Sequence, residues 1–314
     1  MKLRSLVAAT AFVLAAPASQ AAEFINVLTG GTSGVYYPLG VALSQLYGKA
    51  MPDAKTSVQA TKASAENLNL LQAGRGEVAF SLGDSFSDAW KGNEEAGFKA
   101  PLKKLRTLAA IYPNYIHFIA NADSGIKTLA DLKGKRVSVG APKSGTELNS
   151  RDILRAAGMS YKDLAKVEYL GYQESMELIK NRQIDATLQS SGLGMAAVRD
   201  LANAVKIVII PIPADVVGKL GDAAYSSGVF PANTYNGQTT DVPTVTVQNY
   251  LVTHEGVSTD TVYKMTKAMF ENLDAMQAAH AAAKAINPKT AGIGSPVPLH
   301  PGAEKYYKEA GLIK

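Results

Sequence analysis

The sequence of 314 residues contains no cysteine, one tryptophan and four histidines. Without cysteine, a disulfide framework, a catalytic thiol and a zinc–thiolate site are all excluded. The histidines (His117, His254, His280 and His300) stand far apart and have no metal-ligand spacing. With 27 glycines and 14 prolines, the chain is also not collagen-like. We therefore expect no metal and no cofactor.

Charge of either sign is also scarce, since 19% of the residues are charged and the formal net charge is +5. The densest basic stretches, 99–106 and 133–136, are short. A nucleic-acid-binding surface needs a broad basic patch, so we expect no nucleic-acid partner. At 46% hydrophobic residues, the chain has enough apolar side chains to build cores, and wholesale disorder is excluded.

The first residues have the pattern of a secretory signal peptide. Lys2 and Arg4 precede the apolar stretch 6–16, and Ser19-Gln20-Ala21 is a small-residue cleavage pattern. The apolar stretch is shorter than the ~20 residues of a membrane-spanning helix. This pattern predicts cleavage after Ala21 and a soluble periplasmic protein, with a retained N-terminal anchor as the alternative.

The length fits about two domains, and strand-like runs alternate with helical ones in the pattern of α/β folds. We predict an inserted arrangement in which residues 22–115 and 253–314 form domain 1 and residues 116–252 form domain 2. The second domain is expected to be an α/β unit of its own, not a continuation of the first sheet. Two strand-like crossings, near 115–120 and 246–253, would form a hinge and leave a ligand cleft between two doubly wound domains.

The hydrophobic periodicity and the capping residues predict the individual elements. The expected strands cover 24–28, 77–82, 105–112, 136–139, 167–170, 184–188, 206–210 and 244–252. The expected helices cover 38–49, 64–74, 146–157, 174–181, 193–201, 259–285 and 301–310, with one capped turn at 128–131.

Common catalytic and nucleotide-binding motifs do not occur: there is no HExxH, no GxSxG and no complete P-loop. What the sequence offers instead is a set of loops of small residues, each between a strand end and a helix start. Glycines let the backbone approach a ligand, and the first turn of a helix presents unpaired N–H groups with partial positive charge. In open α/β sheets, ligands bind at the carboxyl ends of strands. These loops therefore predict a cleft that binds a small anion, most simply a carboxylate.

The predicted ligand contacts come from both domains. Domain 1 would supply Gly31, Thr32, Ser33, Tyr36, Tyr37, Ser64 and Asp84, and domain 2 Ser144, Gly145, Thr146, Tyr172, Ser190 and Ser191. Tyr235, in a glycine-bearing loop before the return crossing, could form a lid. Two alternatives stay open: Asp84 could pair with a ligand ammonium group or cap a helix, and Tyr172 could pack in the core or at the rim. Each loop taken alone could also serve only as a helix cap.

These stretches resemble the TAXI family of TRAP-transporter solute-binding proteins. The most specific are GTSGVYYP at 31–38 and HPGAEKYYKEAG at 300–311, and further similar stretches lie at 64–68, 131–137, 144–147 and 241–245. The resemblance spans the chain from about Phe24 to the end. It implies a two-domain periplasmic binding protein of the type II fold that passes its ligand to the membrane subunits of a TRAP transporter. It also implies a small carboxylate ligand such as glutamate or 2-oxoglutarate. The sequence departs from the common pattern at Lys62-Ala63.

Two other functions share parts of this pattern. A sensory ligand-binding domain would have the same fold and would differ in its membrane partner. A periplasmic serine hydrolase would need His117 or His254 to lie beside Ser33 or Ser144, because a serine nucleophile requires an activating base. No arginine falls within the predicted loops, so glutamate, 2-oxoglutarate and other small carboxylates remain open. We expect no catalytic residue and a monomer.

Overall fold

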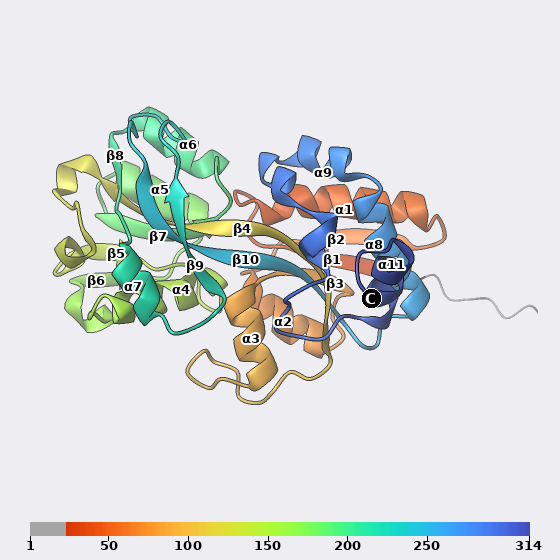
Figure 1. The fold of residues 1–314 in the computed structure, drawn as a ribbon. Helices are drawn as coiled ribbons and strands as arrows, with labels where there is room; N and C mark the ends of the chain where they lie inside the picture. The colour runs from red at the N-terminus through yellow and green to blue at the C-terminus, as the bar shows by residue number, and fades with distance from the viewer. Residues whose placement is uncertain (1–22) are drawn as a thin grey trace, which may run out of the picture.

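The computed structural model describes residues 23–314 (Figure 1). The predicted signal peptide, residues 1–21 with cleavage after Ala21, lies outside the described residues. Within them, no helix has both the length and the apolar character needed to cross a bilayer.

Within residues 23–314, ten strands form one sheet, eight of them in the order β2-β1-β3-β10-β4-β7-β5-β6. In addition, β8 pairs with β4 and β9 pairs with β10. The strands are β1 (Phe24–Leu28), β2 (Lys55–Gln59), β3 (Val78–Leu82), β4 (Leu105–Asn121), β5 (Arg136–Ser138), β6 (Lys166–Glu168), β7 (Ala186–Ser191), β8 (Ile207–Ile209), β9 (Tyr225–Phe230) and β10 (Val242–His254).

Helices cover both faces of this sheet and gather into two groups, which we call the first and second lobe (Figure 1). The first lobe holds β1–β3 with α1 (Tyr36–Ala50), α2 (Ser64–Gln72), α3 (Gly83–Lys91), α8 (Thr259–Phe270), α9 (Leu273–Ala279), α10 (Pro288–Ala291) and α11 (Pro301–Glu309). The second lobe holds β5–β9 with α4 (Gly145–Ala156), α5 (Tyr172–Lys180), α6 (Ala196–Ala204) and α7 (Ala214–Lys219). Among the described residues there are also four short 3₁₀ turns, η1 (Ala122–Ser124), η2 (Leu129–Leu132) and η3 (Tyr161–Asp163) in the second lobe and η4 (Ala281–Ala285) in the first.

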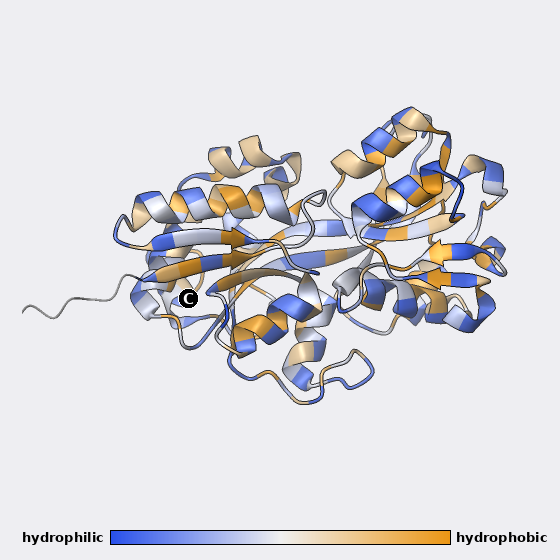
Figure 2. Ribbon diagram, turned by 180° about the vertical axis from the view of Figure 1, so that it is seen from behind, coloured by the Kyte–Doolittle hydropathy of each residue, from blue (hydrophilic) through white to orange (hydrophobic). Residues whose placement is uncertain are grey.

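Each lobe has its own hydrophobic core. In the first lobe, α1 and α8 pack against β1 and β3 through residues such as Leu43, Phe80 and Met269. In the second lobe, α4 packs against β4, β5 and β7 through residues such as Ile153 and Leu188. Several strands carry apolar stretches, and the helices alternate polar and apolar bands (Figure 2). This pattern is typical of a sheet covered by amphipathic helices.

The α/β fold class is confirmed, but the expectation of a separate second sheet is wrong. Strand β4 is 17 residues long and runs from one lobe into the other, as does β10 beside it. The two are antiparallel, with Tyr250 opposite Ala110 and Thr246 opposite Tyr115. Strand pairing therefore continues from one lobe into the other, with register shifts between Gln248 and Tyr250 and between Leu251 and Val252. The predicted hinge ranges, 115–120 and 246–253, lie within these strands, and the domain boundaries stay a prediction.

Local differences from the predicted elements have simple causes. Helix α1 begins at Tyr36, so Pro38 is its third residue, where the missing N–H costs no intrahelical hydrogen bond. Ser64 is the first residue of α2 and not its cap, since Ala63 occupies the N-cap position; the Ser64 hydroxyl instead accepts a hydrogen bond from the Leu82 N–H at 3.1 Å. The helix expected over 259–285 breaks into α8, α9 and η4. The capped turn predicted at 128–131 is confirmed as η2, with both bonds of the capping box present.

Candidate functional site

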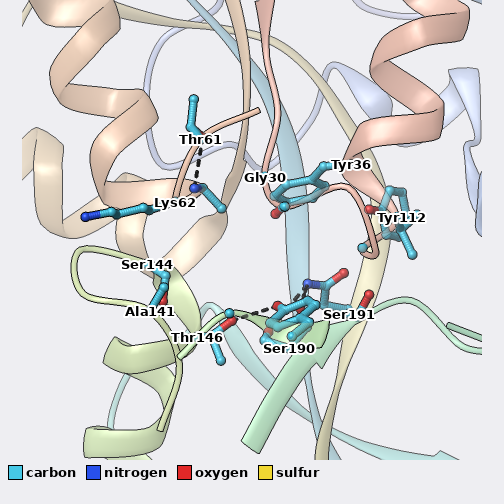
Figure 3. A pocket seen from close by; sticks show the side chains of 17 residues that line it. Gly30, Tyr36, Thr61, Lys62, Tyr112, Ala141, Ser144, Thr146, Ser190 and Ser191 are labelled. Atoms are coloured by element: carbon cyan, nitrogen blue, oxygen red, sulfur yellow. Dashed lines mark hydrogen bonds between the residues drawn. The ribbon is translucent and has the colours of Figure 1, made fainter. Parts of the chain in front are cut away.

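The starts of four helices surround one cavity of about 220 Å³ between the lobes (Figure 3). In the first lobe these are α1 and α2, and in the second lobe α4 and α5. The residues that line the cavity are Gly30, Gly31, Gly34, Val35, Tyr36, Thr61, Lys62, Ala63, Tyr112, Asn114, Ala141, Ser144, Thr146, Gly171, Tyr172, Ser190 and Ser191.

The sheet explains why these segments meet. Strands β1 and β2 are parallel neighbours, and so are β5 and β6. Each of the four strands ends shortly before a segment that lines the cavity. Since parallel strands end at the same edge of a sheet, the loops that follow them lie side by side. Strand β7 ends at Ser191 and adds its last two residues to the same place.

On the second-lobe side, Tyr172 is held by hydrogen bonds at its hydroxyl. The hydroxyl donates to the carbonyl oxygen of Ser190 at 2.6 Å and lies 2.7 Å from the hydroxyl oxygen of Thr146. Across the cavity, a Cβ on Gly34 would lie 3.5 Å from the Tyr172 ring. The glycine loop of the first lobe therefore packs against a ring of the second.

A hydrogen-bonded chain of side chains links the cavity to both crossing strands. The Tyr36 hydroxyl donates to the Asn249 side-chain oxygen on β10. The Asn249 amide donates to the Asn114 side-chain oxygen on β4 at 2.7 Å, and the Asn114 amide donates to the carbonyl oxygen of Ser190 at 2.8 Å. All four residues are buried. The chain thus runs from one cavity wall to the other through β10 and β4.

Two hydroxyl groups of residues in the cavity wall donate no hydrogen bond among the described residues. The Tyr112 side chain is 1% exposed, and its hydroxyl has no hydrogen-bond partner among the described residues. The Ser144 side chain accepts from the Glu147 N–H, which leaves its own O–H free to donate. Burial raises the pKa of Tyr112 well above its usual value and the pKa of Tyr172 to about 12. These phenols therefore remain neutral donors at physiological pH.

Lys62 supplies a positive charge at the rim. It is exposed, and its side chain extends away from Tyr36 and Ser190 (Figure 3). It is the one charged residue in the cavity lining of the described chain. The departure from the family pattern at this position thus places an ammonium group at the edge of the cavity and not in its interior.

Seven of the fourteen residues predicted to contact a ligand line this cavity: Gly31, Tyr36, Ser144, Thr146, Tyr172, Ser190 and Ser191. Thr32, Ser33 and Tyr37 belong to the same loop and helix start but lie outside the lining. Whether the seven bind a ligand stays a prediction.

Ser64 and Gly145 lie where the two lobes touch. A Cβ on Gly145 would lie 2.6 Å from the Ser64 hydroxyl oxygen and 2.7 Å from a methyl carbon of Leu82. Beside them, the Glu66 N–H donates to the carbonyl oxygen of Lys143 at 3.2 Å. The lobes are therefore in direct contact at the starts of α2 and α4, as in a closed cleft.

Asp84 lies outside the cavity and contacts the second lobe. One carboxylate oxygen accepts from the Asn149 amide at 2.6 Å and from the Tyr225 hydroxyl at 2.8 Å. The Tyr225 hydroxyl also lies 3.2 Å from Asp152. Asp84 is 2% exposed, and burial raises its pKa to about 7. We call Asp84, Asn149, Asp152 and Tyr225 the Asp84 cluster; it joins the lobes, and none of its members lines the cavity.

The prediction that Tyr235 forms a lid is wrong. Its ring is buried in the second-lobe core beside Phe230. The Nδ1–H of His117 donates to the Tyr115 carbonyl at 2.8 Å, so His117 Nε2 accepts from the Tyr235 hydroxyl at 2.6 Å. Burial lowers the pKa of His117 to about 4, which keeps the ring neutral. The Phe230 ring and the hydrogen bond to His117 hold Tyr235 in the second-lobe core.

Sequence reasoning missed ten lining residues: Gly30, Gly34, Val35, Thr61, Lys62, Ala63, Tyr112, Asn114, Ala141 and Gly171. Most lie next to predicted contacts in the same loops, so a wider window would have included them. Asn114 carried a signal of its own, because it is an amide in a largely apolar strand next to the predicted crossing.

Comparisons with solved structures show the same architecture. A TM-score of 0.59 relates the chain to PhnD1 of Prochlorococcus marinus in complex with methylphosphonate, at 11% identity over 93% of this chain and 99% of that one. A putative L-cystine ABC transporter protein of Listeria monocytogenes gives 0.53, at 16% identity over 84% and 98%. The alkanesulfonate-binding protein SsuA of Xanthomonas axonopodis pv. citri, bound to MOPS, gives 0.51, at 14% identity over 94% and 96%.

The protein therefore has the fold of the type II periplasmic binding proteins. The chain belongs to the NMT1-like family, whose pattern it matches over residues 27–311.

Proposed function

We propose that this protein is a periplasmic solute-binding protein that captures a small organic anion between its lobes and delivers it to a membrane permease. The observation that carries the proposal is the convergence of four helix starts, two from each lobe, on one cavity. Each helix start carries about half a positive charge and several unpaired N–H groups. Such an arrangement suits an anion, most simply a carboxylate.

The lobe contacts support a capture mechanism by closure. The first lobe supplies α1 and α2 and the second lobe α4 and α5, so a ligand in the cavity contacts both lobes at once. A ligand that contacts both lobes favours the closed form, and about 1.4 kcal/mol of such preference shifts the open-to-closed ratio tenfold. Bending would take place within 115–120 of β4 and 246–253 of β10.

The membrane partner is proposed to be a TRAP-type permease. The support is the resemblance of GTSGVYYP and HPGAEKYYKEAG to the TAXI family. The solved structures that share the fold include a protein described as part of an ABC transporter, and the fold alone does not decide between the two transporter types. A neighbouring gene that encodes a permease with many membrane helices would support a transporter over a sensory receptor.

A serine hydrolase is disfavoured by the positions of the histidines. Both ring nitrogens of His117 are engaged, by Tyr115 and Tyr235. His254 accepts from the Gly256 N–H through Nδ1 and lies at the far end of β10. Ser144 therefore has neither of these residues as an activating base.

The test is mass spectrometry of small molecules that co-purify with the protein, followed by calorimetric titration of the ligand-free protein with small carboxylates. Thr146→Val removes a cavity hydroxyl, and Ser227→Ala removes an exposed hydroxyl on β9 as a control. We expect tight binding of at least one carboxylate, weakened by the first variant and unchanged in the second. If no carboxylate binds, the proposed substrate class is wrong.

A further inference from the structure

The cavity offers donors but no carboxylate to a ligand. Its lining in the described chain contains neither Asp nor Glu. It does contain the starts of four helices, whose partial charges attract anions and repel cations. A buried ammonium group without a carboxylate partner is strongly unfavourable. The electrostatics of this site therefore oppose a ligand with a positive charge.

None of the carboxylates in the first turns of these helices, Glu66, Glu147 and Glu174, lines the cavity. Glu147 pairs with Arg151 at 2.6 Å and accepts from the Tyr161 hydroxyl at 2.9 Å. Glu66 accepts from the main-chain N–H of Lys62 at 2.6 Å. Asp84 is held by Asn149 and Tyr225 in the Asp84 cluster. None of these carboxylates is therefore placed at the cavity, where it could meet an ammonium group of a ligand.

The unused groups of the wall are hydrogen-bond donors. The Tyr112 hydroxyl is buried without a partner, and the Ser144 hydroxyl accepts one bond and is free to donate another. An unmade hydrogen bond of a buried group costs free energy, which a ligand with a matching acceptor recovers. An oxo or hydroxyl oxygen is such an acceptor, whereas an ammonium group has only donors.

We propose that the cavity selects carboxylates that carry an oxo or hydroxyl group beside the carboxylate and rejects the corresponding amino acids. This inference rests on the proposed function and specifies its substrate class. The volume of about 220 Å³ limits the ligand to a small molecule. The Tyr112 hydroxyl then donates a hydrogen bond to the oxo or hydroxyl oxygen of the ligand, while the N–H groups at the helix starts bind its carboxylate.

The test uses matched pairs of ligands that differ in one substituent: 2-oxoglutarate with L-glutamate, and 4-methyl-2-oxopentanoate with L-leucine. Each is titrated calorimetrically into the full-length mature protein, freed of bound ligand, at one pH and one salt concentration. We expect the oxo acid of at least one pair to bind about tenfold or more tightly than its amino acid. The positive helix starts and the lack of a carboxylate in the cavity lining both favour the oxo acid over the amino acid.

Two variants that remove the same atom separate ligand recognition from stability. Tyr112→Phe deletes the unpartnered hydroxyl in the cavity wall. Tyr47→Phe deletes another buried and unpartnered hydroxyl, in the first-lobe core away from the cavity. We expect Tyr112→Phe to lower the affinity for the oxo acid about tenfold without changing the unfolding midpoint of the protein. Tyr47→Phe should leave the affinity unchanged.

The outcomes separate this inference from the proposed function. Amino acids that bind as tightly as their oxo partners, or more tightly, would overturn the inference and leave carboxylate capture intact. Equal losses of affinity for the oxo acid in Tyr112→Phe and Tyr47→Phe would also overturn it, because the Tyr112 hydroxyl would then affect binding only through the stability of the fold. Failure of all four ligands and of every other carboxylate would remove the proposed function itself.

Discussion

The Asp84 cluster predicts that a single hydroxyl in the second lobe helps to hold the lobes together. Tyr225→Phe removes the O–H that reaches Asp84 at 2.8 Å and Asp152 at 3.2 Å, with little change in volume. At pH 8, above the pKa of about 7, Asp84 is charged. A hydrogen bond to a charged group is worth about 1.5–3 kcal/mol. The open-to-closed ratio should therefore rise about ten- to a hundredfold.

Small-angle X-ray scattering of the ligand-free protein measures this change as an increase in the radius of gyration. The matched control is Tyr235→Phe, which also loses a buried hydroxyl, here 2.6 Å from His117 within the second lobe. The control should lower the free energy of unfolding without expanding the molecule. If Tyr225→Phe scatters like the wild type, or if both variants expand equally, then the cluster does not hold the lobes together and the reasoning is wrong.

Three further predictions follow from the same structure. Because burial raises the pKa of Asp84 to about 7, the closed form binds its proton more strongly than an exposed carboxyl would. Raising the pH from 6 to 8 should therefore weaken closure, seen as a larger radius of gyration, and Asp84→Asn should abolish this dependence. Gly145→Ala places a Cβ 2.6 Å from a serine oxygen of the other lobe, so it should expand the molecule in scattering while changing the urea unfolding free energy by less than about 1 kcal/mol. Gly302→Ala places a Cβ 2.3 Å from the Thr259 carbonyl oxygen and should cost about 1–3 kcal/mol of stability by urea titration, whereas Gly218→Ala, with nothing within 4 Å, should cost none.

The parts of the site that could be predicted from sequence are those made by local chemistry. The segment from Gly30 to Tyr36 combines a strand end, glycines and a helix start within a few residues, and its predicted contacts Gly31 and Tyr36 line the cavity. The same holds for Ser144 and Thr146 at the start of α4. The conformational freedom of glycine and the free N–H groups of a helix start are properties of a short stretch of chain, so they can be predicted from the sequence of that stretch alone.

The parts that could not be predicted depend on pairing over long distances. Asn114 lines the cavity because β4 pairs with both β7 and β10, and its partner Asn249 lies 135 residues away. Asp84 was expected in the cavity, but Tyr225, 141 residues further along, takes its carboxylate instead. Periodicity and capping signals describe one segment at a time and contain no information on such partners.

Strand β10 has a consequence for how the chain acquires its structure. It is the neighbour of β3, β4 and β9, yet it comes only after residue 241 of 314. Until it arrives, β3 and β4 each present an unpaired edge, which can join strands of other chains. Such long-range pairing also slows folding. Truncations that end before Val242 should thus aggregate, and β10 insertion is the step at which both halves of the molecule become complete together.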